Sequence, residues 1–135
     1  VRQNTQKSLA DRGVTLITHS GGGTLNCNAD LIQSLLINLV DNAAKAYDTD
    51  APDKRVFLNF SADTIEVRDF GRGIPEEAMG RIFEPFYMAD KSRRKKAGGS
   101  GLGLALVKRI ANAHDAELTV KSGVGKGTTV RVRFQ

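Results

Sequence analysis

Residues 31–47, LIQSLLINLVDNAAKAY, carry the pattern on which the fold prediction depends. Apolar residues recur at i, i+1, i+4 and i+5, as they do along one side of an α-helix. They are Leu31, Ile32, Leu35, Leu36, Leu39, Val40, Ala43 and Ala44. Asn38, Asp41, Asn42 and Lys45 fall within roughly 100° of arc on the opposite side, because each helical residue turns the chain by about 100°. The stretch therefore predicts a helix with one buried and one polar side.

Shorter patterns on either side of this helix predict a sheet. Alternating runs bounded by turn residues predict strands at 14–18, 24–27, 56–60, 64–69, 117–121 and 128–134. Further helices are predicted at 2–12 and 102–114, with a short one that has Pro75 as its first residue. The elements together predict a two-layer α/β (α+β) sandwich, in which about three helices pack on one face of a mixed, mostly antiparallel sheet.

Length and composition exclude several classes of protein. A chain of 135 residues with 40% hydrophobic residues suits a single domain spanning 1–135. The one cysteine, Cys27, excludes a disulfide framework, and the longest apolar run is too short for a membrane helix. Because the chain opens at Val1 rather than Met, we expect it to be part of a longer protein.

The positive charge is concentrated in one segment. The net charge is +5, and Lys91, Arg93, Arg94, Lys95 and Lys96 account for the whole excess. This local charge favours an acidic partner, such as nucleic acid, anionic lipid or a phosphate compound. An aromatic content of only 6% and the absence of Trp argue against a nucleic-acid-binding module that stacks bases.

Three glycine-containing motifs could contact a ligand. In Asp69-x-Gly71-x-Gly73, an acidic residue ends a strand and could accept a hydrogen bond from an amino group, while the glycines admit a planar ring. The glycines of 98–103 lead into a helix and could bind an anion. The third motif is Gly125-Lys126-Gly127-Thr128. Each motif alone also fits an ordinary turn.

The order and spacing of the motifs are more specific than any one of them. The series closely resembles the ATP-binding catalytic domain of sensor histidine kinases, which has the Bergerat (GHKL) fold. The resemblance covers residues 13–134. The motifs correspond to that family's N, G1, F, G2 and G3 boxes and are Asn38-x-x-x-Asn42-Ala43, Asp69-x-Gly71-x-Gly73, Phe83-Glu84-Pro85-Phe86, Gly99-x-Gly101-Leu102-Gly103-Leu104 and Gly125-x-Gly127-Thr128.

The resemblance implies a Mg²⁺·ATP site with assigned roles. Asn38, Asn42 and Lys45 would be the catalytic residues: Asn42 as the metal ligand, Asn38 supporting metal and phosphates, and Lys45 contacting phosphate. At the other end of the nucleotide, Asp69 would accept a hydrogen bond from the adenine amino group. Gly71 and Gly73 would shape the adenine wall, and Thr128 would hydrogen-bond near adenine.

The resemblance also implies an ATP lid over residues 88–99. Phe83 and Phe86 would anchor its start, and Arg93 and Arg94 are the expected phosphate contacts. The segment with Gly99, Gly101, Leu102 and Gly103 would bring backbone N–H groups to the phosphates.

Two positions depart from the family pattern. The residue after Lys45 is usually aromatic, whereas here it is Ala46 and Tyr47 follows about 100° further round the helix. Tyr47 either replaces that aromatic residue near the nucleotide or lies away from it. The last helix ends in His114-Asp115-Ala116 instead of His-Gly-Gly, which places Asp115 at a position that favours a left-handed backbone.

The resemblance implies transfer of the γ-phosphate to a histidine on a separate helical dimerisation domain, with a response regulator downstream. Neither His19 nor His114 lies in the acceptor motif, so we expect the acceptor outside this chain. We expect a cytoplasmic, monomeric domain that contacts neither nucleic acid nor membrane. The alternative is another Bergerat-fold ATPase or an anti-sigma-type serine kinase. Those relatives commonly carry a glutamate where this chain has Asn38.

Overall fold

The computed structural model describes residues 13–20, 29–47, 54–61, 63–84 and 103–134. The elements are β1 (Thr15–Ser20), α2 (Ala29–Lys45), β2 (Arg55–Phe60), β3 (Thr64–Asp69), the 3-10 turn η1 (Glu76–Ala78), α4 (Gly103–Ala113), β4 (Glu117–Gly123) and β5 (Gly127–Arg133). The predicted helix at 2–12, the strand at 24–27 and the lid at 88–99 lie outside the described residues.

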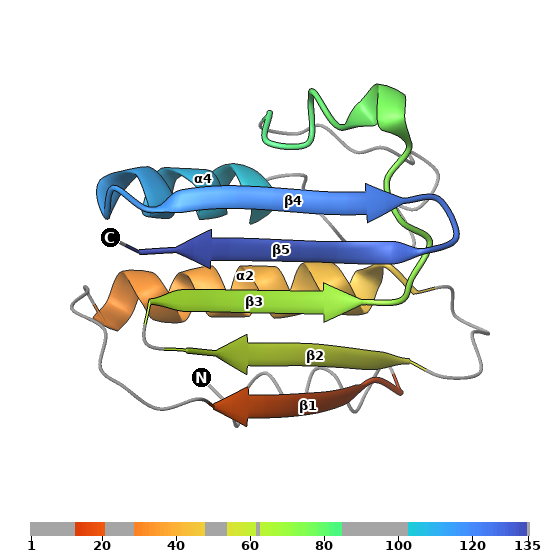
Figure 1. Ribbon diagram of the computed structural model, residues 1–135, viewed down its shortest axis with the longest axis horizontal. Coiled ribbons are helices and arrows are strands. Elements are labelled where there is room, and N and C mark those ends of the chain that lie inside the picture. Colours follow the sequence, from red (N-terminus) through yellow and green to blue (C-terminus); the bar gives the residue numbers. More distant parts are fainter. Residues whose placement is uncertain (1–12, 21–28, 48–53, 62, 85–102, 135) are drawn as a thin grey trace.

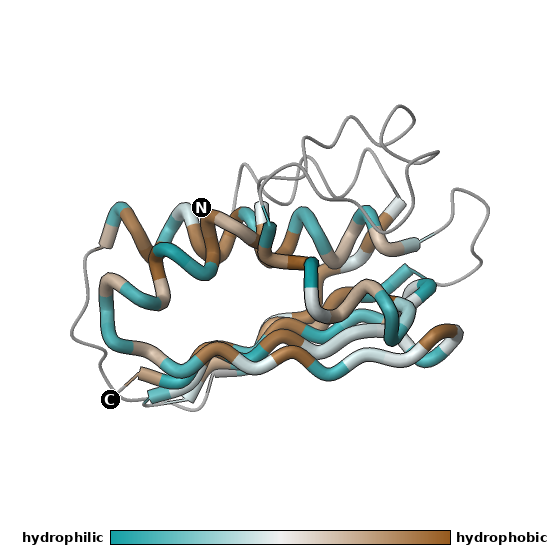
Figure 2. Tube along the Cα trace, turned by 90° about the horizontal axis from the view of Figure 1, so that it is seen from above, coloured by the Kyte–Doolittle hydropathy of each residue, from teal (hydrophilic) through white to brown (hydrophobic). Residues whose placement is uncertain are grey.

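The strands of the described residues form one five-stranded sheet in the order β1-β2-β3-β5-β4. β1 and β2 are parallel, and the other neighbours are antiparallel. Both α-helices lie on the same side of the sheet (Figures 1 and 2). The predicted mixed, mostly antiparallel sheet with helices on one face is therefore confirmed.

The prediction of about three helices is wrong for the described part of the chain, which has two α-helices. The segment after Pro75 forms only the 3-10 turn Glu76–Ala78, and Pro75 precedes it with an extended ψ of 145°. Ala78 is the one buried residue of this turn. Gly80 follows this turn after one residue, and a glycine inside a helix costs about 1 kcal/mol relative to alanine, so the segment does not continue as a longer helix.

The core lies between the helices and the inner face of the sheet. Leu35, Leu39 and Val40 of α2 are almost fully buried, as predicted from their spacing. Two residues of the predicted apolar stripe differ: Leu36 is only partly buried, and Leu31, in the first turn of the helix, is 38% exposed. Neither described α-helix combines the length and apolarity that crossing a bilayer requires. The inner sheet residues include Val56, Leu58, Ile65, Val67, Val130 and Val132.

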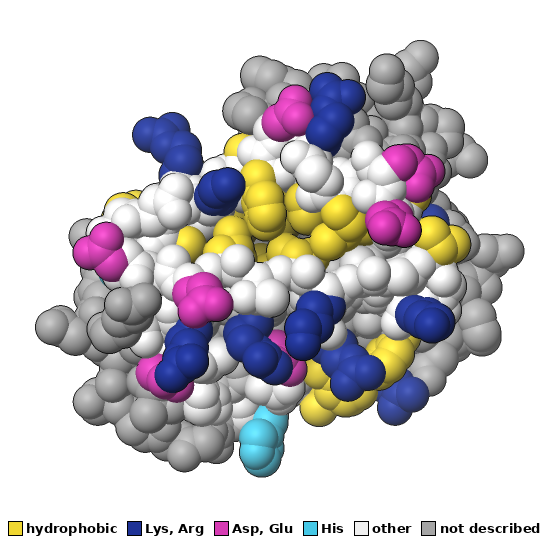
Figure 3. Space-filling view, turned by 45° about the horizontal axis from the view of Figure 1, so that its top comes forward, with side chains coloured by type: hydrophobic (Ala, Val, Ile, Leu, Met, Phe, Trp, Pro, Cys, Tyr) yellow, Lys and Arg dark blue, Asp and Glu magenta, His cyan; other side chains and the backbone are white. Residues whose placement is uncertain are grey.

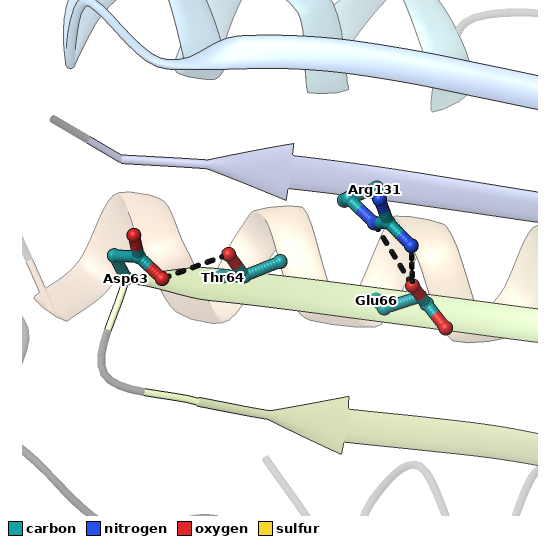
Figure 4. Close-up of polar contacts among 4 residues, drawn as sticks. All are labelled: Asp63, Thr64, Glu66 and Arg131. Carbon is teal, nitrogen blue, oxygen red and sulfur yellow. Dashed lines mark hydrogen bonds and ion pairs between the residues drawn. The ribbon is translucent and has the colours of Figure 1, made fainter.

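The outer face of the sheet is polar and charged. Figure 3 shows Lys and Arg side chains gathered across it, with acidic side chains between them. In Figure 4, Arg131 of β5 reaches Glu66 of β3, with 2.7 Å between nitrogen and oxygen. Arg133 pairs with Asp63 at 3.6 Å. Exposed pairs of this kind contribute roughly 0–1 kcal/mol, so the fold depends on the inner face.

Candidate functional site

The inner face of the sheet becomes polar at one end. Asp69, the last residue of β3, lies opposite Thr128 of β5, which in turn lies opposite Ser122 of β4. Asp69 is 3% exposed and Thr128 is 6% exposed, although the other inner positions of these strands are mostly apolar. Buried polar groups need partners. Two buried polar residues, with the partly buried Ser122 beside them, therefore mark a candidate site at this end of the apolar face.

Burial changes the ionisation of Asp69. Desolvation raises the pKa of its carboxyl from 3.8 to about 6. Hydrogen bonds to the backbone of Gly71 and Thr128 and the nearby charge of Arg72 lower the pKa and limit the rise. The Gly71 N–H donates to Asp69 Oδ1 at 2.8 Å. At neutral pH this end of the sheet therefore presents a buried carboxylate, a strong hydrogen-bond acceptor.

The turn after Asp69 is held in close contact with two other segments. A Cβ at Gly71 would lie 2.4 Å from the carbonyl oxygen of Ala46, directly after α2. A Cβ at Gly73 would lie 1.9 Å from the carbonyl oxygen of Gly123, and its φ of +77° also favours glycine. The glycines predicted to shape a ligand wall thus allow the turn to fit between α2 and β4.

Backbone hydrogen bonds join the same three segments. The Arg72 N–H donates to the Ala46 carbonyl oxygen at 3.0 Å, and the Arg72 carbonyl oxygen accepts from the Gly125 N–H at 2.8 Å. Arg72 Nη1 also donates to the carbonyl oxygen of Lys45 at 3.2 Å. The turn is therefore fixed between the C-terminal end of α2 and the β4–β5 turn.

The polar side of α2 carries the predicted asparagine and lysine residues. Asn38, Asp41, Asn42 and Lys45 are all partly buried. Asn38 Nδ2 donates to the Ser34 carbonyl oxygen at 2.8 Å. A Cβ at Gly103, the first residue of α4, would lie 3.3 Å from Asn38 Oδ1. The amide oxygen of Asn38 therefore lies close to the N-terminal end of α4, where helix N–H groups attract anions.

Lys45 forms an ion pair with a residue of its own helix. Its Nζ lies 2.9 Å from Asp41 Oδ2, one turn earlier. The side chains of Lys45 and Asp41 are 25% and 39% exposed, so both remain in contact with solvent. An anion that binds Lys45 would therefore compete with Asp41.

The predicted lid anchor is only partly within the described residues. Phe83 is partly buried, and Lys108 Nζ of α4 lies 5.2 Å from the centre of its ring. This cation–π contact links the segment after η1 to α4. The predicted residues Phe86, Arg93, Arg94, Gly99, Gly101 and Leu102 lie outside the described residues.

Sequence reasoning missed Ser122. Its hydroxyl accepts from the Ile74 N–H at 2.7 Å and lies 2.8 Å from Thr128 Oγ1. It thus ties the end of the glycine turn to the predicted ligand residue Thr128. The signal was available, because Leu118, Val120 and Ser122 share one side of β4 and only Ser122 is polar.

Tyr47 does not lie on the polar side of α2. It is 6% exposed and belongs to the hydrophobic core. Its hydroxyl accepts from the Phe70 N–H and contacts the Arg55 carbonyl oxygen. No spacing rule could have predicted this contact, because the chain leaves the helix just before Tyr47. Asp115, by contrast, adopts the predicted left-handed backbone, with φ of +52°.

The donors available for a cation are amide oxygens. Among the described residues there is no cluster of three or more His, Cys, Asp or Glu that could hold a metal ion. Asn38 and Asn42 instead offer hard oxygen donors one helical turn apart. This sparse donor set fits Mg²⁺, which keeps several waters and is commonly shared between protein oxygens and phosphates.

Comparisons with known proteins agree on one family. Residues 27–135 match the model of the histidine kinase-, DNA gyrase B- and HSP90-like ATPases. The chain is 39% identical over 130 residues to the sensor histidine kinase YkoH of Bacillus subtilis strain 168, covering 96% of this chain and 28% of YkoH. It thus spans about a quarter of the length of the curated relatives it matches.

Solved structures agree on the fold. The mycobacterial sensor histidine kinase MprB superposes with a TM-score of 0.77 at 23% identity, covering 98% of this chain and 91% of that one. Full-length ShkA, solved in complex with AMPPNP, superposes with a TM-score of 0.77 at 24% identity, covering 98% of this chain and 28% of that one.

Proposed function

Since the chain belongs to the histidine kinase-, DNA gyrase B- and HSP90-like ATPase family, we propose that it binds Mg²⁺·ATP and transfers the γ-phosphate to a histidine on a separate domain of a two-component sensor kinase. The observation that carries this proposal is the convergence of two features. The buried Asp69 faces the helix layer at the end of the sheet where the α2 C-terminus meets the glycine turn. The asparagine side of α2 adjoins the first residue of α4.

The two buried polar residues at the sheet end would bind the base. The Asp69 carboxylate accepts a hydrogen bond from the amino group of adenine, and Thr128 contributes its hydroxyl. Burial strengthens such bonds, because little water competes for the acceptor. Gly71 and Gly73 would shape the wall beside the ring by letting the turn pack closely against the end of α2 and β4.

The polar side of α2 would bind the phosphates. Asn42 would hold Mg²⁺, Asn38 would support metal and phosphates, and Lys45 would exchange its partner Asp41 for a phosphate oxygen. When bound, Mg²⁺ neutralises charge on the phosphates. Gly103 would add the N-terminal end of α4, which favours negative charge.

The same residues favour phosphotransfer over hydrolysis. In transfer, a neutral imidazole nitrogen attacks the γ-phosphorus, the bond to the β–γ bridging oxygen breaks, and ADP leaves. In hydrolysis, a positioned group must orient a water molecule and help remove its proton. Asn38 carries a neutral amide that cannot take that proton, and its Nδ2 is held by the Ser34 carbonyl. Glu84 forms an exposed ion pair with Arg81, with 3.0 Å between Glu84 Oε2 and Arg81 Nε.

Phosphotransfer to a supplied acceptor tests the proposal. Incubated alone with labelled ATP, the chain should form no acid-labile phosphohistidine. Adding the helical phosphoacceptor domain of a sensor kinase should produce it, weakly because the two domains are not tethered. A response regulator added next should remove the label. Robust phosphate release by the chain alone, unchanged by Asn38→Ala, would instead indicate a hydrolysing ATPase.

A further inference from the structure

Tyr47 lies beside the proposed site, but the proposed function gives it no role. It follows α2 by two residues and is buried to 6% exposure in the hydrophobic core. Its hydroxyl accepts the Phe70 N–H, with 2.8 Å between oxygen and nitrogen, and donates to the Arg55 carbonyl oxygen. Because a phenol has one proton, this pair of bonds uses the hydroxyl as both donor and acceptor.

The hydroxyl extends the β2–β3 ladder by one step. The register pairs Val56 with Asp69 at this end of the two strands. Continued by one residue, it places Arg55 opposite Phe70. The Tyr47 hydroxyl joins the C=O of Arg55 to the N–H of Phe70, so a side chain from the end of α2 makes this connection. Tyr47 therefore holds the Phe70 backbone to β2, while the rings of Phe57 and Phe70 make a separate contact with 5.7 Å between their centres.

Three successive N–H groups after Asp69 have three different anchors. The Phe70 N–H binds the Tyr47 hydroxyl, the Gly71 N–H binds Asp69 Oδ1, and the Arg72 N–H binds the Ala46 carbonyl oxygen. Two of these anchors belong to the residues directly after α2. The Phe70 nitrogen also belongs to the peptide group formed with Asp69, so the Tyr47 hydroxyl restrains the backbone that carries the Asp69 carboxylate.

We propose that Tyr47 is a positioning residue for base recognition: its hydroxyl fixes the Asp69–Phe70 peptide group, and through it the Asp69 carboxylate, relative to the end of α2. The inference rests on the proposed function, since it assigns Tyr47 to the site in which Asp69 accepts the adenine amino group. Tyr47 acts from within the core and does not touch the nucleotide.

The variant Tyr47→Phe separates this role from core packing. It keeps the buried ring and removes only the oxygen that joins Arg55 to Phe70. Buried backbone groups that lose a partner move toward another one, so the Asp69–Phe70 peptide group should shift. Phe134→Leu is the matched control. Phe134 is also 6% exposed, and it follows β5 at the opposite end from Thr128.

The test compares Mg²⁺·ATP with Mg²⁺·ITP by titration calorimetry, at a temperature at which circular dichroism shows every variant folded. ITP has a carbonyl oxygen where ATP has the amino group, and both carry the same phosphates. Tyr47→Phe should raise the Kd for ATP roughly tenfold, the scale of one buried hydrogen bond, and raise the Kd for ITP by less. The preference for ATP over ITP should therefore shrink. Phe134→Leu should lower Tm and leave that preference unchanged.

The outcomes separate the inference from the proposed function. If Tyr47→Phe keeps the wild-type preference for ATP, or raises the Kd for ATP and for ITP by the same factor, Tyr47 is only a core residue and the inference is overturned. If the wild-type chain binds neither nucleotide, the proposed function fails and the inference fails with it. A wild-type chain that binds ATP and ITP equally would overturn the inference alone, because Asp69 would then not recognise the amino group.

Discussion

The base end and the phosphate end of the proposed nucleotide site differ in how the chain builds them. The base end is Asp69, Thr128 and the turn at 70–73, and three distant segments hold it by buried contacts. The phosphate end is the polar side of α2, where helical spacing alone aligns Asn38, Asn42 and Lys45. A substitution at the base end should therefore change both stability and binding, whereas one at the phosphate end can change binding alone.

The sharpest test of this contrast is Asn42→Ala at the phosphate end. Asn42 is partly exposed on a helix that is held by its opposite side, and alanine favours helices. We expect Mg²⁺-dependent ATP binding to fall at least ~100-fold, because a metal ligand is lost, while Tm changes by no more than about 2 °C. Titration calorimetry and thermal unfolding measure the two quantities.

Asn112→Ala is the matched control for that experiment. Asn112 is an exposed asparagine on α4. Its replacement should change neither binding nor Tm. Unchanged Mg²⁺·ATP affinity in Asn42→Ala would remove Asn42 from the site and break the contrast at its phosphate end.

At the base end, Asp69→Asn should lose ATP binding, as Asn42→Ala does. Unlike Asn42→Ala, it should also gain stability. Because the folded-state pKa is raised from 3.8 to about 6, the folded chain binds the proton more tightly than the unfolded chain. Asp69 therefore contributes stability that is present below about pH 3.8 and is lost as pH rises through about 6. Between pH 4 and 7 the free energy of unfolding of the variant should gain up to about 3 kcal/mol relative to wild type.

Urea unfolding across that pH range measures the gain, with Asp30→Asn as a control for the change in net charge. Asp30 is exposed in the first turn of α2. A difference between Asp69→Asn and wild type that stays constant with pH would show that burial of Asp69 has no energetic consequence.

Gly71→Ala tests whether the turn tolerates any movement. The added Cβ would lie 2.4 Å from the Ala46 carbonyl oxygen, so the turn or the end of α2 must shift. Overpacking of this kind costs about 1–3 kcal/mol, and ATP binding should weaken as well because Asp69 is displaced. Gly80→Ala is the control, since nothing lies within 4 Å of the Cβ it would add. Equal stability of the two variants in urea would contradict the tight fit.

The two ends also differ in how far the sequence predicted them. The spacing of Leu35, Leu39 and Val40 was enough to place Asn38 and Asn42 on the polar side of α2, because a helix aligns residues four apart by local geometry alone. Strand alternation placed Val130 and Val132 inside. Both rules use only neighbours along the chain.

Contacts between distant segments were beyond those rules. The register that sets Asp69 opposite Thr128 joins residues 59 positions apart and depends on the whole sheet. The burial of Tyr47 likewise depends on packing between distant segments. The assignment of ligand roles came from the resemblance and stays a prediction, and Phe86, Arg93 and Arg94 lie outside the described residues.

The smallest expected effect concerns Asp41, which could set how readily the phosphate end binds its ligand. Asp41 Oδ2 lies 2.9 Å from Lys45 Nζ, in a partly exposed pair one helical turn apart. Such pairs stabilise a helix by about 0.3–0.5 kcal/mol, so Asp41→Asn should barely change the free energy of unfolding. It should, however, lower the Kd for Mg²⁺·ATP about two- to threefold at low salt, because a phosphate oxygen no longer competes with the carboxylate for Lys45. Salt screens interactions between exposed charges, so the gain should fade in calorimetric titrations as ionic strength rises. A Kd that is unchanged or higher at low salt would show that Lys45 does not exchange Asp41 for phosphate, and the phosphate end would then depend on Asn38, Asn42 and the N-terminal end of α4.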